Sequence, residues 1–280
     1  MSDNSIYATP KLVTDINECR FYHSMDIPGY GFVKGIFDLR QGVDKYLGNV
    51  DFNGKRVLEM GTASGFLCFH MERRGADVVA YDLSEVAYDQ SENSIWDIVP
   101  LYNCDHEQLL EERREVARGL NNAFWFGHKA FNSSAKMVYG SVYTIPREIG
   151  MVDVSTFGGI LLHVRDPFLA LQNALRLTRE TVIITNGLRG PLEGILDKLH
   201  FPVKLRDSFH SPRMTFYPTT DKPERVDTWW SLSPRILIRM IAVLGFEDTT
   251  VNYHWQIFGN GKKVRLFTIV GRRTKEYYSY

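Results

Sequence analysis

The chain has 280 residues, and its 33 Lys and Arg residues balance 33 Asp and Glu residues, so the formal net charge is zero. This length fits one large domain with additions, and the balanced charge gives no general attraction to nucleic acid. The three cysteines, Cys19, Cys68 and Cys104, are far apart and form no Cys-x-x-Cys pair, which argues against a disulfide framework and a structural zinc site. No apolar run approaches the length of a membrane span and the first ten residues are polar, so we expect a cytoplasmic protein without a membrane segment.

A glycine turn between a strand and a helix is the strongest functional signal. A short buried strand is expected around Val57, followed by Gly61 and Gly65 and then by a helix over residues 66–74. Glycine lets the backbone turn sharply and lets a ligand approach, and the helix N-terminus offers unpaired N–H groups. The next strand ends at Asp82, where a carboxylate suits two ribose hydroxyls. The segment predicts a ligand that contains a nucleoside.

The spacing within the turn argues against a dinucleotide. In the pattern G-x-G-x-x-G counted from Gly61, the second and third glycines are replaced by Ala63 and Phe66. A Phe at the third position obstructs the close helix–strand packing that the glycine allows. Glu59, two residues before Gly61, is a poor neighbour for a phosphate and a good one for an ammonium group.

Two long segments exceed what simple strand–helix connections need. The first, 84–136, contains a charged and then aromatic portion, 107–131, with Trp125 and His128 near its end. Aromatic stripes are usually core, so we expect a long helix that packs on the sheet. The second, 188–230, is rich in Pro, Arg, His and aromatic residues. Insertions at the carboxyl ends of strands lie over the ligand crevice in open α/β sheets, so we expect this segment to cover the acceptor.

The rest of the chain alternates strands and helices. A third strand is expected in 137–146, and a fourth in 152–167, which leads into an amphipathic helix. The apolar run 181–185 is expected to be a fifth strand, covered on both faces.

The C-terminal part predicts a helix and a hairpin. Ser233 begins the helix and Gly245 ends it. The alternating segments 246–255 and 264–270 flank an Asn-Gly pair, which is a strong signal for an antiparallel hairpin.

Together these motifs resemble class I S-adenosylmethionine-dependent methyltransferases over roughly residues 50–275. The pattern strand–Glu–x–Gly–x–x–x–Gly with a later Asp is similar to motifs I and II of that family. The sequence Leu-Leu-His-Val-Arg-Asp-Pro after the fourth strand resembles the tRNA wobble-uridine carboxymethyltransferase. The resemblance implies a Rossmann-like α/β fold, with a mostly parallel seven-stranded sheet, a C-terminal antiparallel hairpin and helices on both faces.

The resemblance also implies a domain organisation. Residues 1–49 are expected to form a leader that caps the active site, and residues 50–280 the methyltransferase domain. The domain carries insertions at about 84–136 and 188–230.

S-adenosyl-L-methionine is the cofactor that the resemblance implies. Its expected ligands follow the glycine turn and the strand ends: Glu59, Gly61, Thr62, Ala63, Ser64, Gly65, Asp82, Leu83, Ser141, Val142 and Phe157. The family pattern has an Asp that contacts adenine where this chain has Ser141, so backbone contacts are expected there instead. No metal-binding cluster is visible in the sequence.

The candidate catalytic residues are His163, His23 and Tyr30, and the candidate substrate-binding residues are Tyr22, Arg213 and Trp229. His163 has two interpretations, a general base near the methyl group or a histidine that ties down the turn before Pro167, and the second is the more common role. Trp229 has an equally good alternative as a core anchor.

We expect methyl transfer to an O, N or S atom of a small-molecule metabolite. The alternative is a tRNA-modifying methyltransferase of the wobble-uridine type, which the balanced charge and the lack of an extended N-terminal region disfavour. A non-catalytic binding homologue is disfavoured because Glu59, Asp82 and both glycines are present, and an NAD-dependent dehydrogenase because of Ala63 and Phe66. The acceptor is not determined, and a homodimer stays open.

Overall fold

The computed structural model describes residues 6–85, 105–188, 211–218 and 228–276. Its main sheet contains β3 (Phe37–Asp38), β4 (Arg56–Met60), β5 (Asp77–Asp82), β6 (Lys136–Tyr139), β7 (Val152–Gly158), β8 (Thr178–Gly187), β11 (Asp248–Phe258) and β12 (Lys263–Arg272). The helices are α1 (Val43–Tyr46), α2 (Phe66–Arg73), α3 (His106–Ala130), α4 (Pro167–Leu175) and α7 (Pro234–Val243), with short 3₁₀ helices at Ile16–Glu18 and Arg147–Ile149.

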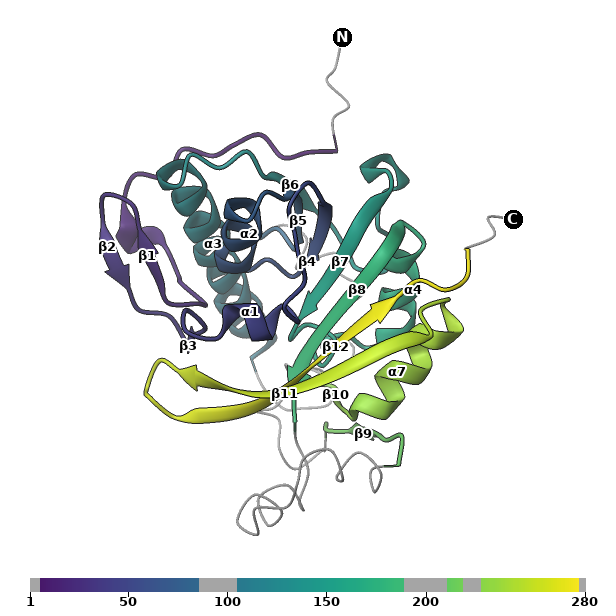
Figure 1. The fold of residues 1–280 in the computed structure, drawn as a ribbon. Coiled ribbons are helices and arrows are strands. Elements are labelled where there is room, and N and C mark those ends of the chain that lie inside the picture. Colours follow the sequence, from purple (N-terminus) through teal and green to yellow (C-terminus); the bar gives the residue numbers. More distant parts are fainter. Residues whose placement is uncertain (1–5, 86–104, 189–210, 219–227, 277–280) are drawn as a thin grey trace.

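The strand order of the main sheet is β3-β11-β12-β8-β7-β4-β5-β6 (Figure 1). The strands from β4 to β8 pair in parallel with one another, whereas β12 is antiparallel to both β8 and β11. The predicted fold class, a largely parallel sheet with an antiparallel C-terminal hairpin and helices on both faces, is confirmed. The predicted count of seven strands is one short of the eight in this sheet, because β3 of the leader pairs with the edge strand β11.

Helices cover both faces of the sheet because side chains along each parallel strand alternate between the faces. Val57 lies in the core that α1, α2 and α3 share with the leader, and the next residue, Leu58, lies in the core of α4 and α7. Both side chains are fully buried. The near-continuous apolar runs of β4 and β8 follow from this double coverage.

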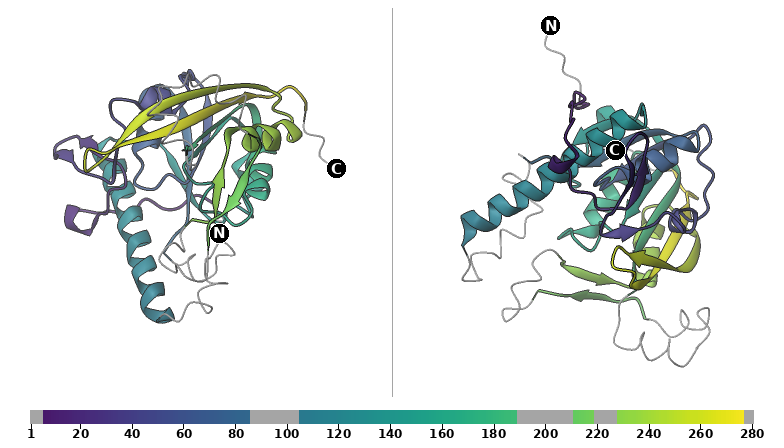
Figure 2. Two further views of the ribbon diagram at one scale, coloured as in Figure 1. Left: turned by 90° about the horizontal axis from the view of Figure 1, so that it is seen from below. Right: turned by 90° about the vertical axis from the view of Figure 1, so that its left-hand side faces the viewer.

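The signals that begin and end helices act as the sequence predicts. Ser233 caps α7 by accepting a hydrogen bond from the Ile236 N–H, and Pro234 occupies the first turn. Gly245 follows α7 with φ of +92°, a left-handed conformation that suits glycine. The long helix predicted for 107–131 is confirmed as α3, whose first half extends beyond the sheet (Figure 2).

The Asn-Gly pair lies in a short hairpin loop between β11 and β12. The Phe258 N–H donates to the Lys262 carbonyl at 2.8 Å, so three residues form the loop. Gly261, with φ of +83°, takes the left-handed position that such loops require.

The leader packs on the sheet and on two helices. A separate hairpin of β1 (Met25–Ile27) and β2 (Gly31–Val33) turns at Pro28 and Gly29, with the Tyr30 N–H donating to the Ile27 carbonyl at 3.0 Å. A type II turn favours proline and then glycine as its two central residues, and Gly29 has the positive φ, +78°, that the second position requires.

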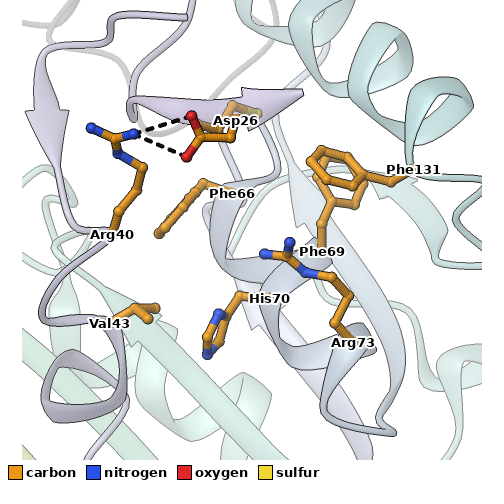
Figure 3. A pocket seen from close by; sticks show the side chains of 9 residues that line it. Asp26, Arg40, Val43, Phe66, Phe69, His70, Arg73 and Phe131 are labelled. Carbon is orange, nitrogen blue, oxygen red and sulfur yellow. Dashed lines mark hydrogen bonds and ion pairs between the residues drawn. The ribbon is translucent and has the colours of Figure 1, made fainter. Parts of the chain in front are cut away.

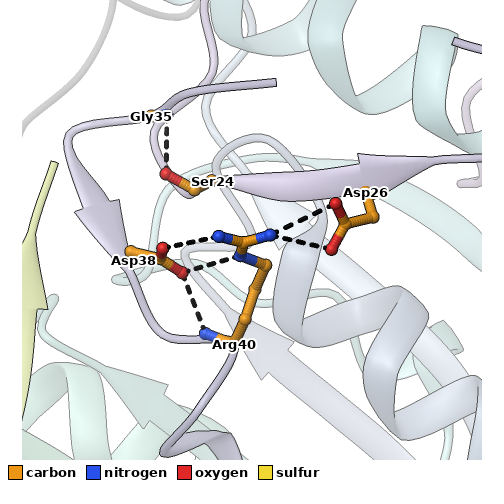
Figure 4. Close-up of polar contacts among 5 residues, drawn as sticks. All are labelled: Ser24, Asp26, Gly35, Asp38 and Arg40. Carbon is orange, nitrogen blue, oxygen red and sulfur yellow. Dashed lines mark hydrogen bonds and ion pairs between the residues drawn. The ribbon is translucent and has the colours of Figure 1, made fainter. Parts of the chain in front are cut away.

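Arg40 ties the two ends of this leader segment together (Figure 4). Its guanidinium contacts the carboxylate of Asp26 on β1 and that of Asp38 on β3, each at 2.9 Å. The Ser24 hydroxyl accepts from the Gly35 N–H at 2.9 Å in the same region. The β1–β2 hairpin is therefore held against the strand that joins the main sheet.

A second hairpin belongs to the described part of the 188–230 segment. β9 (Met214–Phe216) pairs with β10 (Trp230–Leu232), and the Trp229 N–H and Trp230 Nε1 donate to the carbonyls of Leu162 and Arg165. The hairpin is thus attached to the connection that follows β7. No helix within the described ranges is long and apolar enough to cross a bilayer.

Candidate functional site

Glu59 of β4 and Thr156 of β7 are neighbours at the place where the strand order of the sheet reverses. They are Cα partners in the parallel pairing, so their side chains leave the same face of the sheet. Each residue is 2% exposed, and neither Glu59 Oε1 nor Thr156 Oγ1 has a hydrogen-bond partner among the residues that the structure describes. A buried unpaired polar atom costs about 1–3 kcal/mol. A polar ligand in the crevice outside these strand ends would relieve that cost at both atoms.

The Glu59 carboxyl group is neutral more often than is usual for a glutamate. Its Oε2 accepts from the Thr62 hydroxyl at 2.6 Å. Burial, opposed by the Thr62 hydrogen bond and helped by the charge of Asp82, raises the pKa of Glu59 to about 8. A ligand with a positive charge beside Oε1 would favour the ionised form.

Asp82, at the end of β5, holds the glycine turn. Its Oδ2 accepts from the Ala63 N–H and its Oδ1 from the Leu83 N–H, both at 2.7 Å. Burial raises the pKa of the Asp82 carboxyl, while these two hydrogen bonds lower it. Each oxygen keeps acceptor capacity for a hydroxyl of a ligand.

Ala63 has the backbone conformation of the glycine that it replaces. Its φ is +49°, in the left-handed region, which costs a non-glycine residue roughly 1–2 kcal/mol. The hydrogen bond to Asp82 holds it there. Alanine in place of glycine at position 63 therefore makes the turn less stable but leaves its backbone conformation unchanged.

Ala63→Gly is expected to raise the free energy of unfolding by up to about 1 kcal/mol, because relief of the left-handed strain outweighs the greater freedom of glycine in the unfolded chain. The same substitution at Ala117, inside α3, should lower it by about 1 kcal/mol. Chemical denaturation of both variants measures the two values. Equal losses in the two variants would contradict the strain at Ala63.

The two predicted glycines are required for different reasons. A Cβ on Gly61 would lie 2.8 Å from Ile160, so the connection after β7 closes over the turn here. A Cβ on Gly65 would lie 2.6 Å from Phe69 and 2.9 Å from Phe124, so Gly65 allows α2 to pack on α3. The requirement at Gly65 comes from helix packing as well as from its φ of +84°.

The side chain of Ser64 binds the leader. Its hydroxyl accepts from the Tyr22 N–H at 3.1 Å and from the His23 N–H at 3.4 Å, and the residue has no exposed surface. The two leader candidates Tyr22 and His23 are thus brought onto the glycine turn. Because the Ser64 hydroxyl is bonded to the leader, only the backbone of Ser64 is available to bind a cofactor as predicted.

His23 is a buried, neutral imidazole. It is 6% exposed, its ring packs 5.6 Å from that of Phe66, and its Nδ1 has no partner in the described parts of the chain. Burial lowers the pKa of His23 to about 3. A group with this pKa is a poor general base at neutral pH and a good fixed donor or acceptor.

The expected adenine-side residues are largely occupied by internal contacts. The Ser141 carbonyl accepts from the Tyr81 hydroxyl at 2.9 Å, and the Ser141 hydroxyl accepts from the Tyr143 N–H. Val142 and Phe157 are buried members of the core beside α4 and α7. For Phe157, which is 1% exposed, this means a packing role.

The other catalytic and substrate candidates are not brought together. Tyr30 is 57% exposed at the tip of the β1–β2 hairpin, with its ring 4.6 Å from Phe126 of α3, so it is left out of the site. The His163 N–H donates to the Ile160 carbonyl in the connection after β7, which fits the turn-stabilising interpretation. Arg213 is exposed, and its Nε donates to the Ser211 hydroxyl. Trp229 is 4% exposed and its Nε1 has no partner among the described residues.

Two residues of the site carry no sequence signal. Thr156 is one of three polar residues in β7, and only the register of β4 against β7 places it beside Glu59. Tyr46 lies in a four-residue helix of the leader, and its hydroxyl lies at the carboxyl end of β7, where a Cβ on Gly158 would be 3.1 Å from it.

A cavity of about 180 Å³ lies elsewhere, between the leader and one face of α2 (Figure 3). Phe66, Phe69, His70 and Arg73 share that face by helical spacing. None of Glu59, Asp82 and Thr156 lines it. Ligand pockets usually measure about 300–1,000 Å³, so this cavity is too small for a nucleoside cofactor.

No protein-family model and no curated protein matches the chain. Among solved structures, the N-terminal domain of EvdMO1 is similar, both with SAH bound and in the presence of SAH and D-fucose. In each case the TM-score is 0.51 and the identity 17%, over 92% of this chain and 93% of that domain. Magnesium protoporphyrin IX methyltransferase (ChlM) from Synechocystis PCC 6803, with bound SAH, has a TM-score of 0.47 and 12% identity over 82% of each chain. The strand order and the first of these similarities give the chain the Rossmann-like fold of class I methyltransferases.

Proposed function

We propose that the protein is an S-adenosylmethionine-dependent methyltransferase that acts on an O, N or S atom of a small-molecule metabolite. The observation that carries the proposal is the pair of unpaired buried oxygens, Glu59 Oε1 and Thr156 Oγ1, beside a glycine turn at the switch point of the sheet. A carboxylate there suits the ammonium group of the cofactor's amino-acid end. The EvdMO1 domain, which shares the fold, has SAH bound, and this supports the same class of cofactor.

The electrostatics of the turn favour this cofactor over a dinucleotide. Glu59 is buried and Asp82 half-buried close to the turn, and an ionised carboxylate at either position would repel a pyrophosphate. Phe66 fills the position where a dinucleotide turn has its third glycine, and it is 5% exposed in the core. A ligand with a positive amino-acid end and a neutral nucleoside fits these groups better.

One group of residues would bind the cofactor, and another would form the acceptor site. Glu59 and Thr156 would hold the amino-acid end, and Asp82, which fixes the turn, would hold the ribose. When bound, the cofactor supplies a sulfonium methyl group for in-line displacement. His23, a neutral side chain fixed on the turn through Ser64, would orient the acceptor, and the leader would exclude water.

We further propose that the acceptor is small and that the leader and the β9–β10 hairpin complete its pocket. The formal net charge of zero supplies few contacts to a nucleic acid backbone. Trp229, which precedes β10, has an unpaired buried Nε1 that suits an acceptor oxygen.

Isothermal titration tests the cofactor. We expect binding of S-adenosylmethionine and S-adenosylhomocysteine and no binding of NAD, because the turn lacks a pyrophosphate site. Heat with NAD and none with the two sulfur nucleosides would contradict the proposal. Methyl transfer from labelled cofactor to a metabolite mixture, with bulk tRNA as a separate arm, then tests the acceptor class, and label in tRNA alone would overturn the small-molecule assignment.

A further inference from the structure

Tyr46, a buried residue, places its phenol hydroxyl at the switch point of the sheet. The residue is 6% exposed, and a Cβ on Gly158, the last residue of β7, would lie 3.1 Å from its hydroxyl oxygen. The corresponding distance from Gly159 would be 3.6 Å. β7 therefore ends in glycines where this hydroxyl needs room, directly beside the strand that carries Glu59.

The backbone of Tyr46 is fixed to two strands. Its carbonyl accepts from the Thr185 hydroxyl of β8 at 2.6 Å and from the Thr268 hydroxyl of β12 at 3.1 Å, and both threonines are buried. The ring also packs against that of His254, with centroids 6.2 Å apart. A side chain anchored in this way is positioned before any ligand arrives, which lowers the entropy cost of binding.

The hydroxyl of Tyr46 makes no hydrogen bond to any residue in the described ranges. The hydroxyl therefore keeps its donor for a ligand. Burial, together with nearby Tyr22 and Glu59, raises the pKa of the Tyr46 phenol. The group is therefore a neutral donor at every physiological pH.

We propose that the Tyr46 hydroxyl binds the amino-acid end of the cofactor by donating a hydrogen bond to its carboxylate, an assignment that rests on the proposed methyltransferase function. The amino-acid end carries an ammonium group and a carboxylate. Glu59 attracts the ammonium group and repels the carboxylate, so the carboxylate needs a donor close to Glu59. Tyr46, which is uncharged and fixed at the adjacent strand end, supplies that donor.

The test compares three ligands on Tyr46→Phe by isothermal titration: S-adenosylmethionine, S-adenosylhomocysteine and 5′-methylthioadenosine, which lacks the amino-acid end. Loss of a hydrogen bond to a charged group should raise the Kd of the first two equally, by about ten- to hundredfold, and leave the third unchanged. The variant keeps the ring, so thermal unfolding without ligand should match the wild type. Tyr7→Phe is the matched control, since its hydroxyl contacts Arg56 at the opposite end of β4.

Each other outcome overturns the inference. A loss for S-adenosylmethionine alone would place the hydroxyl at the methyl group, and a loss for all three ligands would place it at the nucleoside or in the fold. Unchanged affinities would show that the carboxylate binds elsewhere. Failure of the wild-type protein to bind any of the three would reject the methyltransferase function itself, and the inference with it.

Discussion

Glu59→Gln is expected to stabilise the ligand-free protein and to weaken S-adenosylmethionine binding. Glu59 is 2% exposed and one of its oxygens has no partner among the described residues, so an ionised carboxylate costs more there than a neutral amide does. The gain in unfolding free energy should be roughly 2–4 kcal/mol between pH 7 and 8. The affinity loss should be about 1.5–3 kcal/mol, the value of a hydrogen bond to a charged group.

The pH dependence of stability follows from the raised pKa. In the unfolded chain Glu59 titrates near the ordinary glutamate pKa of 4.5, and in the folded protein its pKa is about 8. Below the lower value the carboxyl is neutral in both states and costs nothing. Between the two values only the unfolded state has lost the proton, so the contribution of Glu59 makes stability fall as pH rises, and the loss is complete above pH 8. Glu59→Gln should remove this part of the pH profile.

Proton release gives an independent measurement. At pH 7 most Glu59 side chains are protonated, and pairing with the ligand's ammonium group would ionise them. Calorimetry in buffers of different ionisation heat should show release of roughly one proton per site for the wild type and none for Glu59→Gln. Glu180→Gln, at an exposed ion pair with Lys55, is the control and should behave as the wild type. Binding without proton release would mean that Glu59 does not meet a cation.

Asp82 variants are expected to lose both stability and nucleoside affinity. Asp82 accepts from the Ala63 and Leu83 N–H groups, so Asp82→Ala leaves two half-buried donors without their partner. Asp82→Asn can accept only one of them and turns an NH₂ group toward the other. Each variant should lose about 2–3 kcal/mol of unfolding free energy, and roughly 1–3 kcal/mol of binding free energy for S-adenosylmethionine and 5′-methylthioadenosine alike.

The contrast with the Glu59 variant locates the two ends of the ligand. Glu59→Gln should spare 5′-methylthioadenosine, which has no ammonium group, whereas the Asp82 variants should not. Asp77→Asn is the matched control, because Asp77 begins the same strand and forms an exposed ion pair with Arg56. If Asp82→Asn keeps full affinity for both ligands, the ribose does not lie at the end of β5.

Local patterns in the sequence determined the order of the strands and helices and the position of the glycine turn. The apolar run at Val57, the capping Ser233 and the Asn-Gly loop each act over a few residues, so their meaning does not depend on the rest of the chain. Glu59 and Asp82 were found in the same way, because both lie at strand ends beside the turn.

Only the tertiary structure decided which groups of the site are available. The side chains of Thr62 and Ser64 belong to the turn by sequence, yet the first binds Glu59 and the second binds the leader. The pairing register of β4 and β7 places Thr156 beside Glu59. The packing of the leader, whose strand β3 also joins the sheet, places the Tyr46 hydroxyl at the end of β7. These contacts join residues far apart in the chain, and their geometry depends on packing and pairing that no local pattern specifies.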